Sequence, residues 1–122
     1  MKNPRPILLA EDNPNDVELI LAAFKDANFV NEIHVTRDGE VALDFLHRRG
    51  PYAGRTDPLP AVVLLDLKMP KVDGREVLRH VRTDPALRHL PVVILTSSRE
   101  ESDLLASYQL GAPVEPWVFA IA

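Results

Sequence analysis

The chain has 122 residues, enough for one domain with a single hydrophobic core. Its formal net charge of -4 gives no general reason to bind nucleic acid or an anionic membrane surface, and the absence of cysteine excludes disulfides and thiolate metal sites. No apolar run approaches the length of a membrane span, and the first residues become charged too soon for a signal peptide. We therefore expect a cytoplasmic, single-domain protein without a nucleic-acid or membrane partner.

Short apolar runs mark the expected strands. ILLA at 7–10, VVLL at 62–65 and VVIL at 92–95 are continuous blocks, which is typical of parallel strands covered on both faces. The segment EIHVTR at 32–37 alternates more and predicts an edge strand.

Helical spacing fills the intervals between these strands. It predicts helices over 13–28, 38–50, 74–84 and 98–111, the first capped by Asn13 and the last opened by a Ser98/Glu101 capping box. The residues expected to face the core are Val17, Ile20, Leu21, Phe24, Val41, Ala42, Phe45, Leu46, Val77, Leu78, Val81, Leu104, Leu105 and Tyr108. Residues 49–60 read as a surface loop. The alternation of strands and helices predicts an α/β fold with a doubly wound parallel sheet.

Oxygen-bearing side chains follow each of the three apolar runs. Glu11 and Asp12 follow the first run, Asp66 the second, and residues 96–98 (Thr-Ser-Ser) the third. Ligand sites in open parallel sheets form beyond the carboxyl ends of the strands. Carboxylates gathered there repel one another unless a cation or a proton intervenes, and Mg²⁺ prefers such oxygen ligands. The sequence therefore predicts that Asp66 is a nucleophile beside a Mg²⁺ site, able to accept a phosphoryl group.

Each of these residues, taken alone, also has an ordinary structural interpretation. Asp66 could form a turn or cap a helix, Ser98 is a natural helix cap, and Thr96 could simply belong to a strand. The acidic pair at 11–12 could be solvated charge. The coincidence of such residues at three strand ends favours a site.

The histidines give no comparable signal. They are scattered through unrelated segments without the spacing of a metal-binding motif, so we expect no histidine metal cluster from His34, His47, His80 and His89.

Three segments carry a resemblance to a known family. LLAEDNPND (8–16), VVLLDLKMPKVDGREVL (62–78) and VVILTSS (92–98), in this order and spacing, closely resemble the receiver domain of bacterial two-component response regulators. The resemblance covers residues 5 to about 111 and looks most like the small stand-alone receivers that pair with phytochrome-type histidine kinases. It implies a flavodoxin-like sheet with strand order 2-1-3-4-5 and a signalling protein rather than an enzyme.

The resemblance also implies a role for each residue of the acidic cluster. Asp66 is the phosphoacceptor, which takes a phosphoryl group from a kinase phosphohistidine. Glu11, Asp12 and Asp66 bind Mg²⁺, and the backbone carbonyl of Lys68 supplies a further ligand. Gly74 helps to shape the loop that keeps Asp66 accessible.

Three further residues receive roles through the resemblance. Thr96 is the switch residue, whose hydroxyl contacts the acyl phosphate, and Ser97 provides a small neighbour and a backbone N–H. Lys68 and Ser98 are expected to influence the rate at which water hydrolyses the phosphoaspartate.

The C-terminal part departs from the family pattern. Where receivers carry a lysine and a proline after a fifth strand, this chain has Val118, or Glu115-Pro116 if the proline is aligned. The position at which receivers carry an aromatic switch residue is also changed, since it falls on Glu115 in this chain. No alignment of this segment places a basic residue at the position of the receiver lysine, because Lys71 is the last lysine and Arg99 the last arginine in the chain.

These departures lead to expectations about assembly. We treat residues 1–122 as one receiver domain that is family-like to about 111, with an atypical tail at 112–122 and no last helix. An uncovered apolar face predicts self-association, as a homodimer or through an exchanged tail. WVFAIA could enter the chain's own sheet as a fifth strand or pair with another chain, and the tail could stem from a truncation or a frame change.

The leading hypothesis is a receiver whose phosphorylation is impaired by the missing lysine. Its output would be protein–protein contact, since no output domain is expected. The alternative is a pseudo-receiver, a binding module of the same fold that works without phosphorylation. A phosphatase with an aspartyl nucleophile is disfavoured, because Lys68 occupies the position of its general acid. A flavodoxin-like cofactor binder is disfavoured because no phosphate-cradling loop follows the first strand.

Overall fold

The computed structural model describes residues 5–67, 69, 71–96 and 117–120, with the side chains described up to residue 95. Strands and helices alternate along this part of the chain. In order they are β1 (Ile7–Ala10), α1 (Pro14–Asp26), β2 (Ile33–Thr36), α2 (Gly39–His47), the short 3-10 helix η1 (Gly50–Tyr52), β3 (Val62–Asp66), α3 (Gly74–Thr83), β4 (Val92–Thr96) and β5 (Trp117–Ala120).

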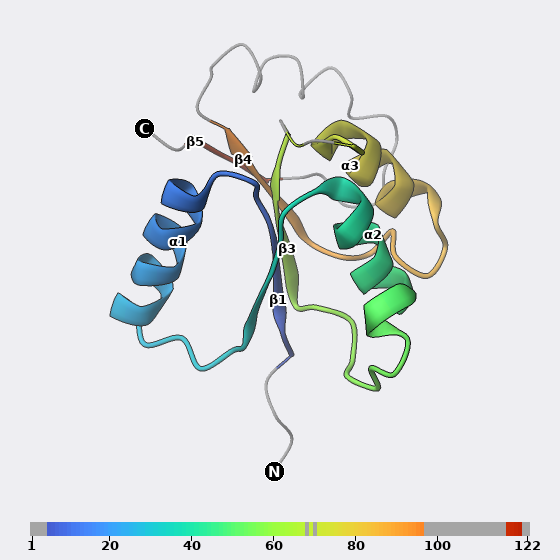
Figure 1. The fold of residues 1–122 in the computed structure, drawn as a ribbon, viewed down its shortest axis with the longest axis horizontal. Helices are drawn as coiled ribbons and strands as arrows, with labels where there is room; N and C mark the ends of the chain where they lie inside the picture. The colour runs from blue at the N-terminus through green and yellow to red at the C-terminus, as the bar shows by residue number, and fades with distance from the viewer. Residues whose placement is uncertain (1–4, 68, 70, 97–116, 121–122) are drawn as a thin grey trace.

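The strands form one parallel sheet in the order β2-β1-β3-β4-β5. Figure 1 shows α1 on one face of this sheet and both α2 and α3 on the other. The predicted doubly wound α/β fold and its strand order are thus confirmed. β5 pairs with β4 from Val93↔Trp117 to Thr96↔Ala120, so residues 117–120 extend the chain's own sheet.

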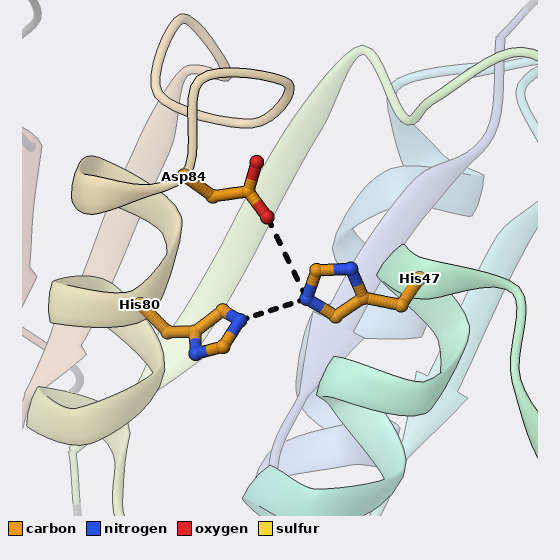
Figure 2. A group of neighbouring side chains, drawn as sticks. All are labelled: His47, His80 and Asp84. Atoms are coloured by element: carbon orange, nitrogen blue, oxygen red, sulfur yellow. Dashed lines mark hydrogen bonds and ion pairs between the residues drawn. The ribbon is translucent and has the colours of Figure 1, made fainter.

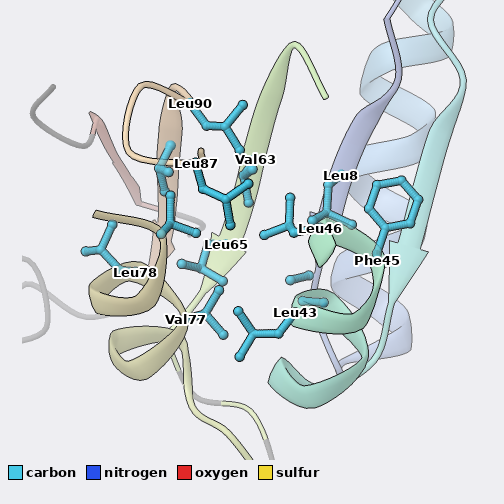
Figure 3. Close-up of a cluster of buried hydrophobic side chains, with 14 of the residues drawn as sticks. Leu8, Leu43, Phe45, Leu46, Val63, Leu65, Val77, Leu78, Leu87 and Leu90 are labelled. Atoms are coloured by element: carbon cyan, nitrogen blue, oxygen red, sulfur yellow. The ribbon is translucent and has the colours of Figure 1, made fainter. Parts of the chain in front are cut away.

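Alternation along the strands divides the core into two layers. In β1, Leu8 and Ala10 face α2 and α3, whereas Ile7 and Leu9 face α1. Figure 3 shows the larger layer, in which strand residues such as Leu65 pack against the helices. Its buried members are Leu8, Ala10, Ala42, Leu43, Phe45, Leu46, Val63, Leu65, Leu67, Met69, Val77, Leu78, Val81, Leu87, Leu90, Val92 and Ile94. The layer beneath α1 has a smaller buried set, Ile7, Leu9, Val17, Leu64 and Leu95.

The helix predictions hold best where a cap or a buried stripe is strong. α1 begins after Asn13, whose side-chain oxygen accepts hydrogen bonds from the backbone N–H groups of Asn15 (2.9 Å) and Asp16 (3.3 Å). The prediction that Leu21 faces the core is wrong, because it lies at the margin of the narrow apolar stripe and is 36% exposed. Along the same helix, Val17 is buried.

α2 ends earlier than predicted. Arg48 takes a left-handed backbone conformation with φ 53°, which terminates the helix at His47 instead of at Gly50. Part of the predicted loop at 49–60 then winds into η1. In α3 the three predicted core residues, Val77, Leu78 and Val81, are all buried. The helix predicted over 98–111, with its core residues, lies outside the described residues.

Two glycines let the β3–α3 loop lie directly against the starts of α2 and α3. A β-carbon at Gly74 would overlap the carbonyl oxygen of Asp66 and come within 2.6 Å of the α-carbon of Leu67. A β-carbon at Gly39 would overlap the carbonyl oxygen of Val72. These close approaches fix the position of the loop that follows Asp66.

Among the described residues, none of the helices combines the length and the apolar character needed to cross a membrane.

The space at Gly74 generates a stability prediction. Gly74→Ala should lower the free energy of unfolding by about 3 kcal/mol, because the added methyl group must displace the backbone of Asp66. Gly54→Ala is the matched control, because a β-carbon there would meet no atom within 4 Å, and its effect should stay within about 0.5 kcal/mol. Urea denaturation followed by circular dichroism measures both, and equal stabilities would contradict the packing described at Gly74.

Candidate functional site

Three acidic side chains converge at one edge of the sheet. β1 and β3 are parallel neighbours, so Glu11 and Asp12, which follow β1, lie beside Asp66, the last residue of β3. One carboxylate oxygen from each of the three residues lies within 4.8 Å of the others. The structure therefore brings together the three predicted acidic residues, which we call the acidic cluster.

Glu11 is the buried member of the acidic cluster. Glu11 is only 2% exposed. Its Oε2 accepts a hydrogen bond from the backbone N–H of Asn13 at 3.2 Å. The backbone N–H of Glu11 donates to the carbonyl oxygen of Thr36 at 3.0 Å. Glu11 is thus held by β2 on one side and by the first turn of α1 on the other.

The pKa of the Glu11 carboxyl is raised from 4.5 to about 8, and burial is the largest cause. A hydrogen bond with the Asp66 side chain contributes to this rise, and so do the negative charges of Asp66 and Asp16. The hydrogen bond from Asn13 acts in the opposite direction. At pH 7, and without a cation, Glu11 therefore carries a proton that it shares with Asp66 in a hydrogen bond.

Exposure increases across the acidic cluster from Glu11 to Asp66 to Asp12. Asp66 is half-buried and Asp12 is exposed, so a ligand can approach these two carboxylates from solvent while Glu11 lies beneath them. Such an arrangement can hold a hard divalent cation and still leave an oxygen of Asp66 open to a reactant.

The loop after Asp66 is packed onto the end of its own strand. Leu67 and Met69 are buried in the core, and the backbone N–H of Gly74 donates to the carbonyl oxygen of Leu67 at 3.0 Å. Asp73 then caps α3 by accepting a hydrogen bond from the backbone N–H of Glu76 at 3.0 Å. This return of the chain keeps Asp66 at the rim of the sheet.

Lys71 is directed to a different carboxylate. Its ammonium group lies 3.8 Å from Oδ2 of Asp38, the residue that caps α2. Lys71 is the last lysine in the sequence, and this ion pair places its ammonium group beside Asp38.

The remaining predicted site residues are described in part or not at all. Thr96 ends β4, one residue past the Asp66↔Leu95 pair, so its backbone lies at the same edge of the sheet as Asp66. Ser97, Ser98 and Lys68 lie outside the described residues.

We expected no histidine metal cluster, yet two of the four histidines meet in the structure in a group that could hold a metal ion. His47 and His80 lie together with Asp84, and a potential ligand atom of each lies within 4.8 Å of the others. The spacing of His80 and Asp84, four residues apart near the end of a predicted helix, was the available sequence signal. The contact with His47 depends on the packing of α2 against α3, which periodicity does not give.

Comparison with known proteins gives a match to the response regulator receiver domain over residues 7–113. Among curated proteins, the chain is 43% identical over 107 residues to response regulator Rcp1 of Synechocystis sp., a match that covers 88% of this chain and 71% of Rcp1.

Solved structures give the same result. The bacteriophytochrome response regulator AtBRR is 54% identical with a TM-score of 0.90, and the match covers 98% of this chain and 83% of AtBRR. The Mn²⁺-bound form of Rcp1 is 39% identical with a TM-score of 0.82 and covers 98% of this chain and 82% of that one. On its sequence match and its fold, this chain belongs to the response regulator receiver domain family of two-component systems.

Proposed function

We propose that the chain is the phosphoacceptor of a two-component phosphorelay, taking a phosphoryl group from a histidine kinase onto Asp66. The observation that carries this proposal is the acidic cluster, in which oxygens of Glu11, Asp12 and Asp66 lie within 4.8 Å of one another. A second support is the half-buried position of Asp66 at the end of β3, where the cluster opens to solvent.

The transfer is a substitution at phosphorus. A carboxylate oxygen of Asp66 forms a bond to the phosphorus atom of a phosphohistidine, the N–P bond breaks, and the electron pair of that bond stays with the kinase imidazole. The protein contributes mainly position: Gly74 and the buried Leu67 hold the backbone on either side of the loop, so the carboxylate is presented in a fixed place.

The donor set of the acidic cluster fits Mg²⁺. Three carboxylates this close favour positive charge between them, and the pKa of Glu11 is raised, mainly by burial, which favours a proton there when no cation is bound. Glu11, Asp12 and Asp66 would hold the ion, together with the backbone carbonyl of Lys68. When bound, Mg²⁺ neutralises charge on the phosphoryl oxygens during transfer.

Thr96 and Ser97 complete the proposed site. Thr96 lies at the end of the strand next to β3, from which its hydroxyl would contact the acyl phosphate. Ser97 follows it directly and would offer a backbone N–H.

The missing lysine weakens this chemistry and supports a second candidate function. The sequence has no lysine after Lys71, whose ammonium group lies beside Asp38. Without a cation on the phosphoryl oxygens, we expect the acyl phosphate to form slowly. A pseudo-receiver that binds its partner without phosphorylation is therefore the alternative.

The relatives suggest the partner. AtBRR is described as a bacteriophytochrome response regulator, and Rcp1 is also a response regulator. We propose that a phytochrome-type histidine kinase in the cytoplasm phosphorylates this chain, and that its output is contact with another protein and not with nucleic acid or a membrane.

Phosphorylation by a small donor tests the leading function against the alternative. Incubation with Mg²⁺ and acetyl phosphate should add one phosphoryl group to the intact mass, and Asp66→Asn should abolish the adduct. Asp57→Asn is the control, since Asp57 is an exposed loop residue outside the acidic cluster, and it should leave the adduct unchanged. If neither acetyl phosphate nor a phosphorylated kinase domain produces an adduct, the pseudo-receiver is the correct function.

The raised pKa of Glu11 leads to a second prediction, on how the stability of the fold depends on pH. The folded-state pKa of about 8 exceeds the ordinary value of 4.5, so the folded chain binds more protons between these pH values than the unfolded chain. The contribution of Glu11 to stability is therefore fully present below pH 4.5 and is lost progressively as the pH rises to about 8.

Thermal unfolding in EDTA measures this loss. The melting temperature of Glu11→Gln should rise relative to that of the original chain as the pH increases from about 5 to 8, because glutamine has no proton to lose. Glu18→Gln, at an exposed position of α1, is the control and should show no such trend. Excess Mg²⁺ should stabilise the original chain most at the high-pH end. A difference that does not change with pH would contradict the buried, protonated state of Glu11.

The third prediction concerns self-association, which we propose proceeds as a homodimer or through an exchanged tail. β5 is the terminal strand of the sheet, and apolar side chains near α1, including Leu19 and Phe29, are exposed. Light scattering coupled to size-exclusion chromatography should give the mass of a dimer or larger species. Deleting residues 112–122 should return the chain to a monomer if the tail is exchanged and should leave the dimer intact if the α1 side forms the interface. A monodisperse monomer of the full chain would refute the proposal.

A further inference from the structure

A second group of potential metal ligands lies between α2 and α3. His47 is the last residue of α2, His80 lies in the last turns of α3, and Asp84 directly follows α3. Figure 2 shows the side chains of His80 and Asp84 both directed at the ring of His47. The Nε2 atoms of the two histidines are 2.8 Å apart, and Oδ2 of Asp84 lies 3.8 Å from Nε2 of His47.

This histidine cluster, defined as His47, His80 and Asp84, is separate from the acidic cluster. α2 and α3 both begin beside the loop that follows Asp66, as the close approaches at Gly39 and Gly74 show. At a rise of about 1.5 Å per residue, His47 lies about 12 Å along α2 from its start, and His80 about 9 Å along α3. The histidine cluster thus belongs to the far ends of the two helices.

Backbone contacts set the orientation of the Asp84 carboxylate. Its Oδ1 accepts a hydrogen bond from the backbone N–H of Ala86 at 2.8 Å, which leaves Oδ2 directed at His47. The backbone N–H of Asp84 donates to the carbonyl oxygen of His80 at 3.1 Å. Carboxylates that act as metal ligands are typically oriented in this way, by a hydrogen bond from another group of the protein.

Charged groups from α2, from α3 and from the residues that follow them surround His47. Burial lowers the pKa of His47, and so do Arg49 and the neighbouring His80, while the negative charges of Asp84 and Asp44 raise it. The guanidinium of Arg49 lies 3.3 Å from Oδ1 of Asp44. The C-terminal ends of α2 and α3 also place partial negative charge near the histidine cluster, which favours a cation there.

We propose that His47, His80 and Asp84 form a second metal site, for a transition-metal dication such as Zn²⁺, with Nε2 of each histidine and Oδ2 of Asp84 as ligands. A tetrahedral Zn²⁺ with bonds of about 2.0–2.1 Å separates its ligand atoms by about 3.3 Å. The observed separations of 2.8 and 3.8 Å lie on either side of this value, so small side-chain rotations suffice. Two imidazole nitrogens and one carboxylate oxygen select this class of ion over Mg²⁺.

Binding replaces the hydrogen bond between the two rings. In the metal-free state one neutral imidazole carries its hydrogen on Nε2 and donates it to Nε2 of the other. For both Nε2 atoms to bind a metal, that ring must carry its hydrogen on Nδ1 instead. Three protein ligands then leave one position for water, and the ion fastens the end of α2 to the end of α3.

Metal titration of the tag-free chain tests this site. With excess Mg²⁺ present to occupy the acidic cluster, calorimetry should detect one Zn²⁺ per chain, and Co²⁺ should give the visible absorption of a tetrahedral site. His47→Gln and His80→Gln should each weaken Zn²⁺ binding at least 10-fold. The matched control is His89→Gln, at an exposed histidine outside the cluster, and it should leave binding unchanged.

Two further variants cover the remaining outcomes. Asp84→Asn retains an oxygen that can accept the Ala86 hydrogen bond, so it should preserve the fold while it weakens Zn²⁺ binding. The double variant Asp12→Asn/Asp66→Asn should keep the site, because it alters only the acidic cluster. Zn²⁺ should also raise the melting temperature of the original chain and of His89→Gln, but not that of His80→Gln. Unchanged binding in the His47, His80 and Asp84 variants, or loss of binding in the acidic-cluster variant alone, would overturn the proposal.

Discussion

The convergence of three carboxylates, one of them buried, is the constraint on which the candidate site depends. Parallel pairing of β1 with β3 forces Glu11, Asp12 and Asp66 to one edge of the sheet, and the burial of Glu11 removes the water that would otherwise screen them. A buried carboxylate in such company is stable only with compensating positive charge. The pKa of Glu11 is raised, mainly by burial, which favours a proton there in the absence of a cation. A proton and the proposed Mg²⁺ would therefore compete for one place, which the fold creates by bringing the three carboxylates together.

The β3–α3 loop transmits the position of Asp66 to both helices on its side of the sheet. Gly39 and Gly74 allow the starts of α2 and α3 to touch the loop backbone without intervening side chains. Asp38 adds a polar link, since its Oδ1 accepts a hydrogen bond from the backbone N–H of Val41 at 2.8 Å while Oδ2 lies 3.8 Å from the ammonium of Lys71. A movement of the loop would therefore reach both helices through rigid backbone contacts.

The sequence predicted those features that depend on local pattern or on strand ends. The apolar blocks placed β1, β3 and β4 closely, and the oxygen-bearing residues after them located the acidic cluster. The sequence did not predict features that depend on how the helices pack against the sheet and against one another. The exposure of Leu21 reflects how much of α1 the sheet covers, and the meeting of His47 with His80 reflects the packing of α2 on α3. Neither leaves a periodic trace in the sequence.

The two clusters of ligands differ in chemistry as well as in place. The acidic cluster offers only oxygen ligands, whereas the histidine cluster offers two imidazole nitrogens and one carboxylate. A hard cation such as Mg²⁺ would therefore prefer the acidic cluster, and a borderline cation such as Zn²⁺ the histidine cluster. α2 and α3 connect the two ends, because their starts touch the loop after Asp66 and their far ends carry His47 and His80. An ion that joins the far ends would restrict the relative movement of the two helices. Any effect of that restriction on cation binding at Asp66 must be reciprocal, because coupling between two binding sites is a single free energy.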